Sequence, residues 1–308
     1  MKILPFPSLL VFAFSVGLSF QKPVFAEVHI AFSRVGEMTT QSYPIAEESS
    51  ENLIIIGDQA DAFRIRKIDG GGRVIDFMPS QGRGIYVAQV VTMGDDEPLY
   101  SLHGLATDKL EGKNEPPLNS ILTVFGISLD PGGTQLMLNT KSETIGDSIP
   151  ASEFRVAEGA DEISVTLLAR YSPKGEAEIG FAVDGGESLQ TFGHMANSSR
   201  LVPDAHQRIY PPAKNEEASF LGAANYRIPA SECPDRFGFY FTGKHFAALT
   251  YPGKAKGAKI KHTARVYPVG KIAGRELKNA YLICFEEAKN GDYQDAVLLV
   301  EGIAPAGE

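Results

Sequence analysis

An acidic run near the C-terminal end, FEEAKNGDYQD at 285–295, holds the residues best suited to chemistry. It carries four carboxylates and an Asn-Gly pair. The apolar stretches 280–285 and 296–300 flank it and predict two strands joined by a long hairpin connection, with Asn290-Gly291 in a tight turn. This arrangement would gather the carboxylates into a small volume, where they repel one another unless a cation or a basic side chain intervenes.

The oxygen-rich side chains of this run are suited to a hard divalent cation. Calcium takes about six to eight oxygens from carboxylates, amides and backbone carbonyls. The predicted metal ligands are Glu286, Glu287, Asn290, Asp292 and Asp295. Gln294 and loop carbonyls could complete the shell, although the spacing is not that of an EF-hand. The alternative is a solvated acidic turn in which Lys289 neutralises one charge, since charged loops are common.

The acidic run also resembles the ending of a β-sandwich domain of unknown function found in exported bacterial proteins. In that family an apolar strand leads into Phe-Glu-Asp, and a Gly-Asp stretch leads into Asp-Tyr-Asn-Asp and a closing strand. Residues 285–287 and 291–295 match these two parts, except that Glu287 stands for Asp and Gln294 for Asn. The resemblance extends weakly over 116–303. It implies a β-sandwich whose acidic residues bind calcium, with a looser shell because Glu is longer than Asp.

Familiar catalytic motifs are missing from the sequence: it has no Gly-x-Ser-x-Gly elbow, His-Glu-x-x-His pair, phosphate loop or Cys-x-x-Cys. Glu286 and Glu287 are adjacent, so on a strand they would point to opposite faces and could not flank one glycosidic bond. Asp204 and His206 lie two residues apart without a nucleophile in view. We therefore favour a non-catalytic binding or structural module. The alternative is a secreted polysaccharide hydrolase with unrecognised carboxylates, and the question of enzymatic activity stays open.

The elements that would position the acidic run are mostly strands. Strand-like runs bounded by Gly, Pro, Asn and Asp are predicted at 28–32, 53–56, 63–68, 74–78, 85–92, 135–139, 163–171, 178–183, 237–242, 246–250, 262–267, 280–285 and 296–300. One segment reads as a short helix, because Leu118, Ile121 and Leu122 have helical spacing between Pro117 and Gly126. The sequence thus predicts an all-β fold, an antiparallel β-sandwich with a smaller N-terminal β domain and one short helix.

Three segments are expected along the chain. Residues 1–26 have a basic start, an apolar stretch and Val24-Phe25-Ala26, which predict a signal peptide cut after Ala26. Residues 27–112 are expected to form the small β domain. Residues 113–308 are expected to form the β-sandwich, because the polar run 108–117 ends in two prolines and marks a boundary.

Composition narrows the range of partners. The net charge is −9, and such a surface argues against nucleic acid. No second long apolar run follows the signal, so no membrane span is expected after cleavage. We expect a periplasmic or extracellular protein whose partner is a glycan or an envelope protein. Cys233 and Cys284 could form a disulfide in an oxidising compartment, or Cys284 could be a small buried hydrophobe.

Overall fold

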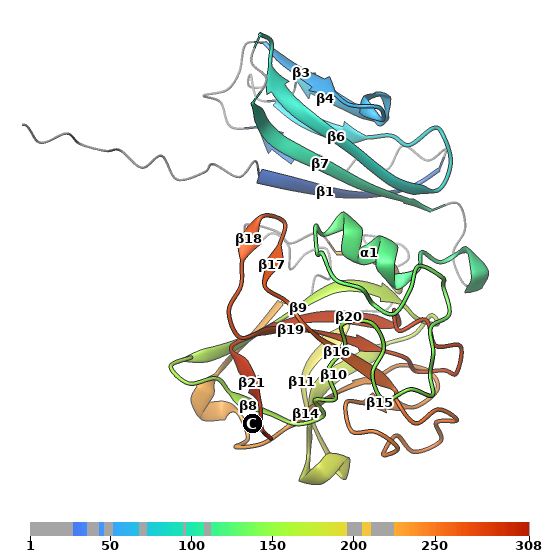
Figure 1. The fold of residues 1–308 in the computed structure, drawn as a ribbon, viewed down its shortest axis with the longest axis vertical. Coiled ribbons are helices and arrows are strands. Elements are labelled where there is room, and N and C mark those ends of the chain that lie inside the picture. Colours follow the sequence, from blue (N-terminus) through green and yellow to red (C-terminus); the bar gives the residue numbers. More distant parts are fainter. Residues whose placement is uncertain are drawn as a thin grey trace, which may run out of the picture.

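A computed structural model describes residues 27–35, 43–45, 52–67, 73–94, 97–107, 112–195, 205–210 and 225–307. The fold is all-β, as predicted, and α1 (Leu118–Val124) is the single α-helix of these ranges (Figure 1). Short 3-10 turns lie at Ala60–Ala62, Gly112–Asn114, Asp184–Gly186 and Ala230–Glu232. The predicted signal peptide lies outside the described residues, and none of the helices in those residues is long and apolar enough to cross a membrane.

The N-terminal strands form two sheets of their own. The larger has the order β1 (Glu27–Arg34), β7 (Pro98–Thr107), β6 (Gly84–Thr92) and β3 (Leu53–Ile56). The smaller has the order β2 (Tyr43–Ile45), β5 (Arg73–Phe77) and β4 (Phe63–Lys67). Apolar residues such as Phe77, Tyr86 and Leu102 pack in one cluster within this unit. β1 runs parallel to β7, and the other strand pairs of this unit run antiparallel.

The C-terminal strands form the predicted sandwich. Its six-stranded sheet contains β12 (Gln207–Ile209), β9 (Glu162–Tyr171), β20 (Ala296–Glu301), β19 (Ala280–Phe285) and β16 (Ala264–Pro268), with β13 (Asn225–Pro229) also paired to β9. Its four-stranded sheet has the order β11 (Ser188–Met195), β10 (Ala177–Val183), β14 (Gly238–Thr242) and β15 (Ala247–Leu249). Two small ribbons pair β8 (Phe154–Val156) with β21 (Ile303–Pro305) and β17 (Lys271–Ile272) with β18 (Arg275–Glu276).

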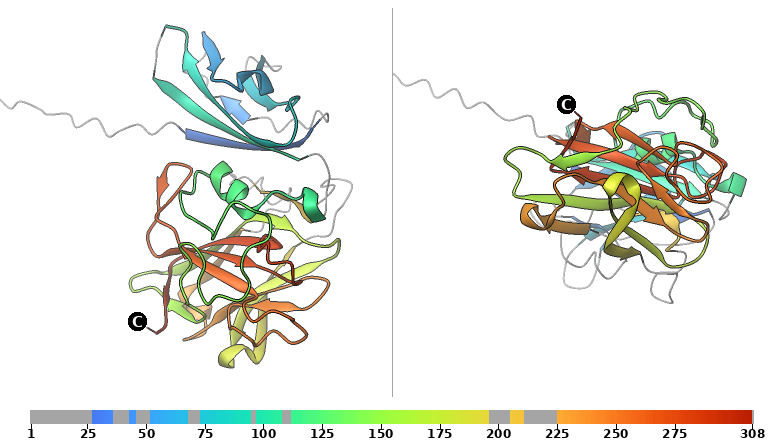
Figure 2. Two further views of the ribbon diagram at one scale, coloured as in Figure 1. Left: turned by 45° about the vertical axis from the view of Figure 1, so that its right-hand side comes forward. Right: turned by 90° about the horizontal axis from the view of Figure 1, so that it is seen from below.

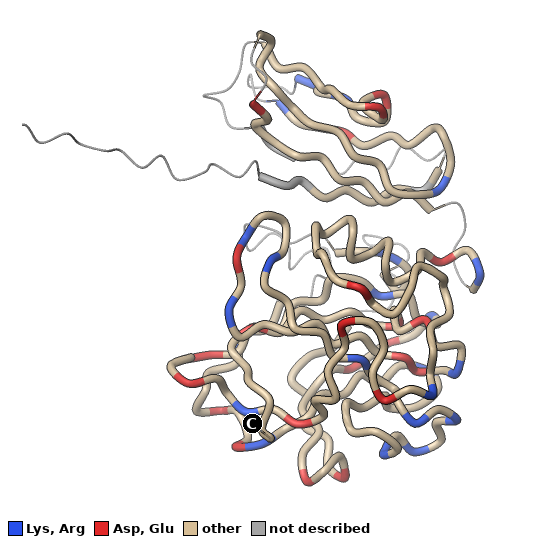
Figure 3. Tube along the Cα trace, in the orientation of Figure 1, with Lys and Arg blue, Asp and Glu red and all other residues tan. Residues whose placement is uncertain are grey.

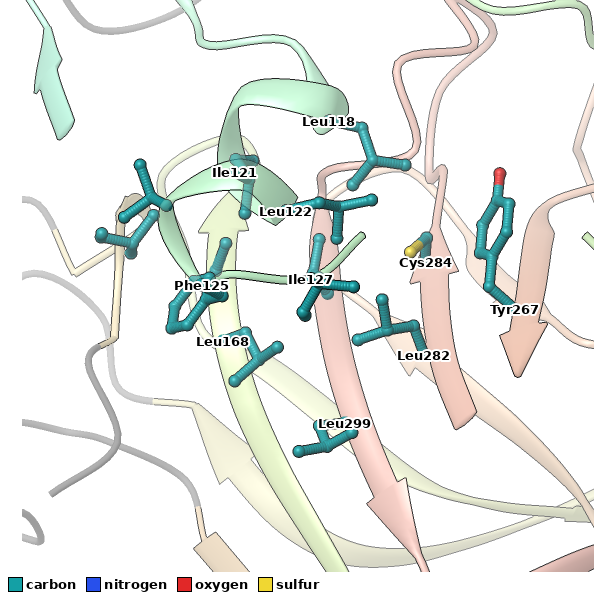
Figure 4. Close-up of a cluster of buried hydrophobic side chains, with 14 of the residues drawn as sticks. Leu118, Ile121, Leu122, Phe125, Ile127, Leu168, Tyr267, Leu282, Cys284 and Leu299 are labelled. Atoms are coloured by element: carbon teal, nitrogen blue, oxygen red, sulfur yellow. The ribbon is translucent and has the colours of Figure 1, made fainter. Parts of the chain in front are cut away.

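Both faces of the six-stranded sheet are covered. Ile283 and Leu298 point toward Phe181 and Phe239 of the four-stranded sheet and share one core cluster with them. The opposite face packs against α1 (Figure 4). Double coverage explains why the predicted closing strand is apolar at consecutive positions rather than at alternating ones, since a strand buried on both faces has no solvent side.

Helix α1 lies between the six-stranded sheet and the larger N-terminal sheet (Figures 1 and 2). It begins after Pro117 and is followed by Gly126 with a φ of 63°, as its start and stop signals predicted. Leu118, Ile121 and Leu122 lie in one cluster with side chains of both neighbouring sheets. The helix therefore joins the N-terminal sheet and the sandwich through a shared apolar core.

Two further expectations are settled by the structure. The predicted strand at 135–139 does not form: the segment is irregular, with Leu138 buried and Met137 62% exposed. Cys233 and Cys284 are both free, so they form no disulfide with each other, and Cys284 is fully buried. Charged residues of both signs are spread along the trace (Figure 3).

Candidate metal centre

The acidic run forms the predicted hairpin connection, but its carboxylates are buried. β19 and β20 pair antiparallel, with Phe285 opposite Ala296, and residues 286–295 join them. The exposed fraction is 0% at Glu286 and Glu287 and 1% at Asp292. The alternative of a solvated acidic turn is therefore wrong. Burial makes each uncompensated charge in this loop costly, so the loop needs internal partners or a cation.

Neighbouring segments hold the loop in place through backbone hydrogen bonds. The Glu286 N–H donates to Thr263 O at 3.0 Å, and the Leu138 N–H donates to Gly291 O at 2.7 Å. Gly291 has a φ of 79°, and an added Cβ would lie 2.6 Å from Thr140 Cγ2. Only glycine fits such a close approach with a left-handed backbone. The turn at 290–291 is thus fixed from outside the hairpin.

Tyr293 secures the second half of the loop. It adopts a φ of 52°, which is uncommon for a residue other than glycine. Its hydroxyl donates to His262 O at 2.8 Å, and the Arg265 guanidinium lies 5.2 Å from the centre of its ring. Arg265 itself donates to the carbonyls of Asn139, Ser142 and Glu143. These contacts connect the acidic loop to the irregular segment 139–143.

Three of the predicted ligands converge. Glu286, Asp292 and Asp295 each offer a carboxylate oxygen, and these oxygens lie within 4.8 Å of one another. We call these three residues the acidic triad. Glu286 is oriented by the loop backbone: its Oε1 accepts from Ala288 N at 2.8 Å, and its Oε2 accepts from Gly291 N at 2.6 Å and Asp292 N at 2.9 Å. Asp295 Oδ2 accepts from Glu287 N at 2.5 Å. The acidic triad is therefore held close together by the fold of its own loop.

Asp292 has one carboxylate oxygen without a hydrogen-bond partner. Its Oδ2 accepts a hydrogen bond from the exposed Asn290 side chain, whereas its Oδ1 is buried and has no hydrogen-bond partner. Burial, followed by the charge of Glu286, raises the pKa of Asp292 to about 9. The same two causes raise the pKa of Asp295. Three converging carboxylates, one of which has an orphaned oxygen, fit a divalent cation that prefers such ligands, so the acidic triad could hold a metal ion.

Glu287 lies apart from the acidic triad. Its carboxylate lies against Gly243, where an added Cβ would be 2.2 Å from Oε2, and neither of its oxygens has a hydrogen-bond partner. Burial raises the pKa of Glu287 to about 7, against the opposing charge of Arg170. The amides of Lys244 and Gly243 also lower this pKa, although they approach the carboxylate without completing a hydrogen bond. The structure thus separates Glu287 from the other predicted ligands.

The sequence did not predict several residues that lie near the acidic loop. Glu115 accepts from Gln294 Nε2 at 3.1 Å and from Gln207 Nε2 at 2.9 Å. Arg170 is fully buried, donates to Ser172 and Gly175, and lies close enough to act on the charges of Glu287 and Asp295. One signal could have found Arg170: an arginine inside an apolar strand needs acceptors nearby.

Comparison with known proteins leaves the site without an assigned role. No protein-family model and no curated protein matches the chain. The resemblance to the exported β-sandwich domain therefore remains an expectation, and the functional argument rests on the geometry of the acidic loop.

Proposed function

We propose that this protein is an exported, non-catalytic binding or structural module in which calcium orders the acidic loop at 286–295. The observation that carries the proposal is the buried acidic triad, whose oxygens converge while Asp292 Oδ1 has no partner. A divalent cation would supply that partner and cancel the repulsion between Glu286, Asp292 and Asp295.

Calcium fits this site better than magnesium on chemical grounds. Magnesium demands a near-ideal octahedral shell and tends to keep several waters, whereas calcium accepts irregular shells made by carboxylates and carbonyls. The oxygens here come from one tightly folded loop, and two of the three carboxylates already accept backbone hydrogen bonds. Such an arrangement favours a cation that tolerates uneven geometry.

Ordering this loop would fix one end of the sandwich. The loop contacts Leu138 and His262, so a cation at the acidic triad would hold the hairpin and the irregular segments beside it in a single arrangement. That end of the sandwich would then offer a fixed surface to a glycan or an envelope protein. Export and the partner class rest on the sequence pattern at 1–26 and on the net charge.

Thermal unfolding tests the proposal. Millimolar calcium should raise the midpoint of the protein relative to EDTA, because a ligand that binds only the folded state stabilises it. Asp292→Asn should remove most of this rise, whereas Asp235→Asn, a change at an exposed acid elsewhere, should keep it. An equal calcium response in both variants would refute the site, as would a wild-type protein that ignores calcium.

The hydrolase alternative has one supporting observation. A surface pocket of about 620 Å³ is lined by Glu176, Glu178 and His194, together with Thr242 and Gly243. Glu178 lies opposite His194 on β11 and Thr242 on β14, and Glu176 is two residues away in the chain. The two carboxylates line one pocket, unlike Glu286 and Glu287. The wild-type protein can be incubated with polysaccharides and assayed for released reducing ends. Release that is lost in Glu178→Gln would favour the hydrolase, whereas no release by the wild type would favour the binding or structural module.

A further inference from the structure

Glu115 connects the acidic loop to the segment that precedes α1. It lies in the chain between β7 and α1, two residues before Pro117, and it is half-buried. Its Oε2 accepts from Gln294 Nε2 at 3.1 Å, across a separation of 179 residues, and its Oε1 accepts from Gln207 Nε2 at 2.9 Å. Two amide side chains from the sandwich therefore hold this carboxylate.

Gln294 directly precedes Asp295 of the acidic triad and carries an open acceptor. Its side chain is fully buried, its Nε2 is used by Glu115, and its Oε1 has no hydrogen-bond partner. The backbone places it between Tyr293 and Asp295, and its carbonyl accepts from Tyr171 N at 3.0 Å. A buried amide oxygen without a donor is costly, and amide oxygens are among the ligands that calcium takes.

Glu115 also contributes charge at the same place. Its negative charge acts on Asp292, a member of the acidic triad. A carboxylate whose charge acts on a buried cluster of acids adds to their repulsion, and a cation would offset this local negative potential. Of the two nearby arginines, Arg170 acts on Asp295 and so offsets part of the charge of the acidic triad, whereas Arg265 covers Tyr293.

The segment that holds Glu115 leads directly into the shared core. Pro116 and Pro117 restrict the backbone between Glu115 and α1. At the far end of the helix, the Val124 carbonyl lies 2.9 Å from Nδ1 of His103 on β7. Leu118 and Ile121 pack in one cluster with side chains of β1 and β7. Fixing the position of Glu115 would therefore also restrain the N-terminal sheet, because the first turn of α1 follows Glu115 closely and packs directly against β1 and β7.

We infer that Gln294 Oε1 is a further cation ligand and that Glu115 is the positioning residue that orients its amide, so that cation binding ties α1 and the N-terminal sheet to the sandwich. The inference rests on the proposed cation site. An outer carboxylate that orients a ligand typically changes metal affinity by about 10–100-fold when it is mutated. The coupling arises because the same carboxylate belongs to the segment that starts α1.

Calorimetric titration of calcium into the metal-free protein, with hydrogen exchange at 118–125, tests the inference. Glu115→Gln keeps the shape of the side chain but removes its charge and one of its two acceptor oxygens. It should weaken calcium binding by about 10-fold or more. In the wild type, calcium should slow exchange in α1; in Glu115→Gln at saturating calcium, this slowing should be lost. Glu158→Gln, at an exposed turn, is the matched control and should behave as the wild type.

The outcomes separate the inference from the function it rests on. A wild-type protein that binds no calcium would overturn the proposed function and the inference together. Calcium binding that is equally tight in Glu115→Gln, or that leaves exchange in α1 unchanged, would overturn the inference alone. Unfolding in EDTA serves as the check on folding, since a purely structural role of Glu115 would lower stability there without changing the response to calcium.

Discussion

Glu287 is a buried carboxylate with no hydrogen bond, and its titration makes stability depend on pH. Its pKa is raised to about 7 in the folded protein, mainly by burial, against an ordinary value of 4.5. Between these values the folded state keeps a proton that the unfolded chain has lost. Stability should therefore fall as pH rises from 4.5 to 7 and stay level above that range, with a total loss of about 3 kcal/mol at most.

Glu287→Gln should remove this part of the pH dependence. We expect the variant to match the wild type near pH 4 and to be more stable at pH 8 by about 1–3 kcal/mol, measured by urea unfolding in EDTA. Asp292 remains in both proteins and its pKa does not depend on Glu287, whereas the charge of Glu287 is one of the smaller causes that raise the pKa of Asp295, so the titration of Asp295 also changes slightly in the variant. Parallel curves of unfolding free energy against pH for the two proteins would contradict the assignment.

Gly291 tests how tightly the acidic loop is packed against its neighbours. Gly291→Ala combines a left-handed backbone with a clash, since the new Cβ would lie 2.6 Å from Thr140 Cγ2 and 2.9 Å from Leu138 O. Gly159 has nearly the same φ, 78° against 79°, and nothing within 4 Å of an added Cβ. Gly159→Ala should cost about 1 kcal/mol for backbone strain, and Gly291→Ala about 1–3 kcal/mol more, by chemical denaturation. Equal losses of unfolding free energy in the two variants would show that the loop can move away from Thr140 and Leu138 at little cost.

The acidic triad was predictable at the scale of residues because its members lie close together in the sequence. Asp292 and Asp295 follow an Asn-Gly turn, and Glu286 precedes it, so one hairpin brings them together. Burial was not predictable, since the covering residues Leu138 and His262 come from distant segments. Glu115 escaped notice for the same reason, because it meets Gln294 only after the chain folds.

At the scale of elements, strands with uninterrupted apolar runs were predicted correctly, whereas a strand whose apolar residues are interrupted was missed. β19 and β3 appear with the expected bounds, as runs that are apolar throughout. β7 was missed because Pro98, Ser101, His103 and Gly104 interrupt its apolar residues. Gly104 has a structural cause: an added Cβ would lie 2.4 Å from the Phe77 ring. The apolar run at 135–139 forms no strand, and there only Leu138 is buried.

Helix α1 shows why a single element can carry much of the stability of the chain. Leu122 is 1% exposed and packs in the cluster that α1 shares with two sheets. Leu122→Ala should lower the unfolding free energy by about 2–5 kcal/mol, because alanine leaves a cavity while preserving helix propensity. Thr123→Ala, at the adjacent exposed position, should change it by less than about 0.5 kcal/mol in the same denaturation experiment. Similar effects at both positions would show that packing under α1 contributes little.

For the molecule as a whole, the shared core predicts that the N-terminal sheet and the sandwich unfold together. Leu105 on β7 is 1% exposed in the cluster around α1, whereas Val87 on β6, in the same sheet, is 44% exposed. Leu105→Ala should lower the midpoint of one common calorimetric transition, and Val87→Ala should leave it nearly unchanged. If the N-terminal sheet melted separately, Leu105→Ala would split the trace into two transitions or move only one of them. A single transition that moves as a unit would show that the apolar contact beneath α1 couples the two parts.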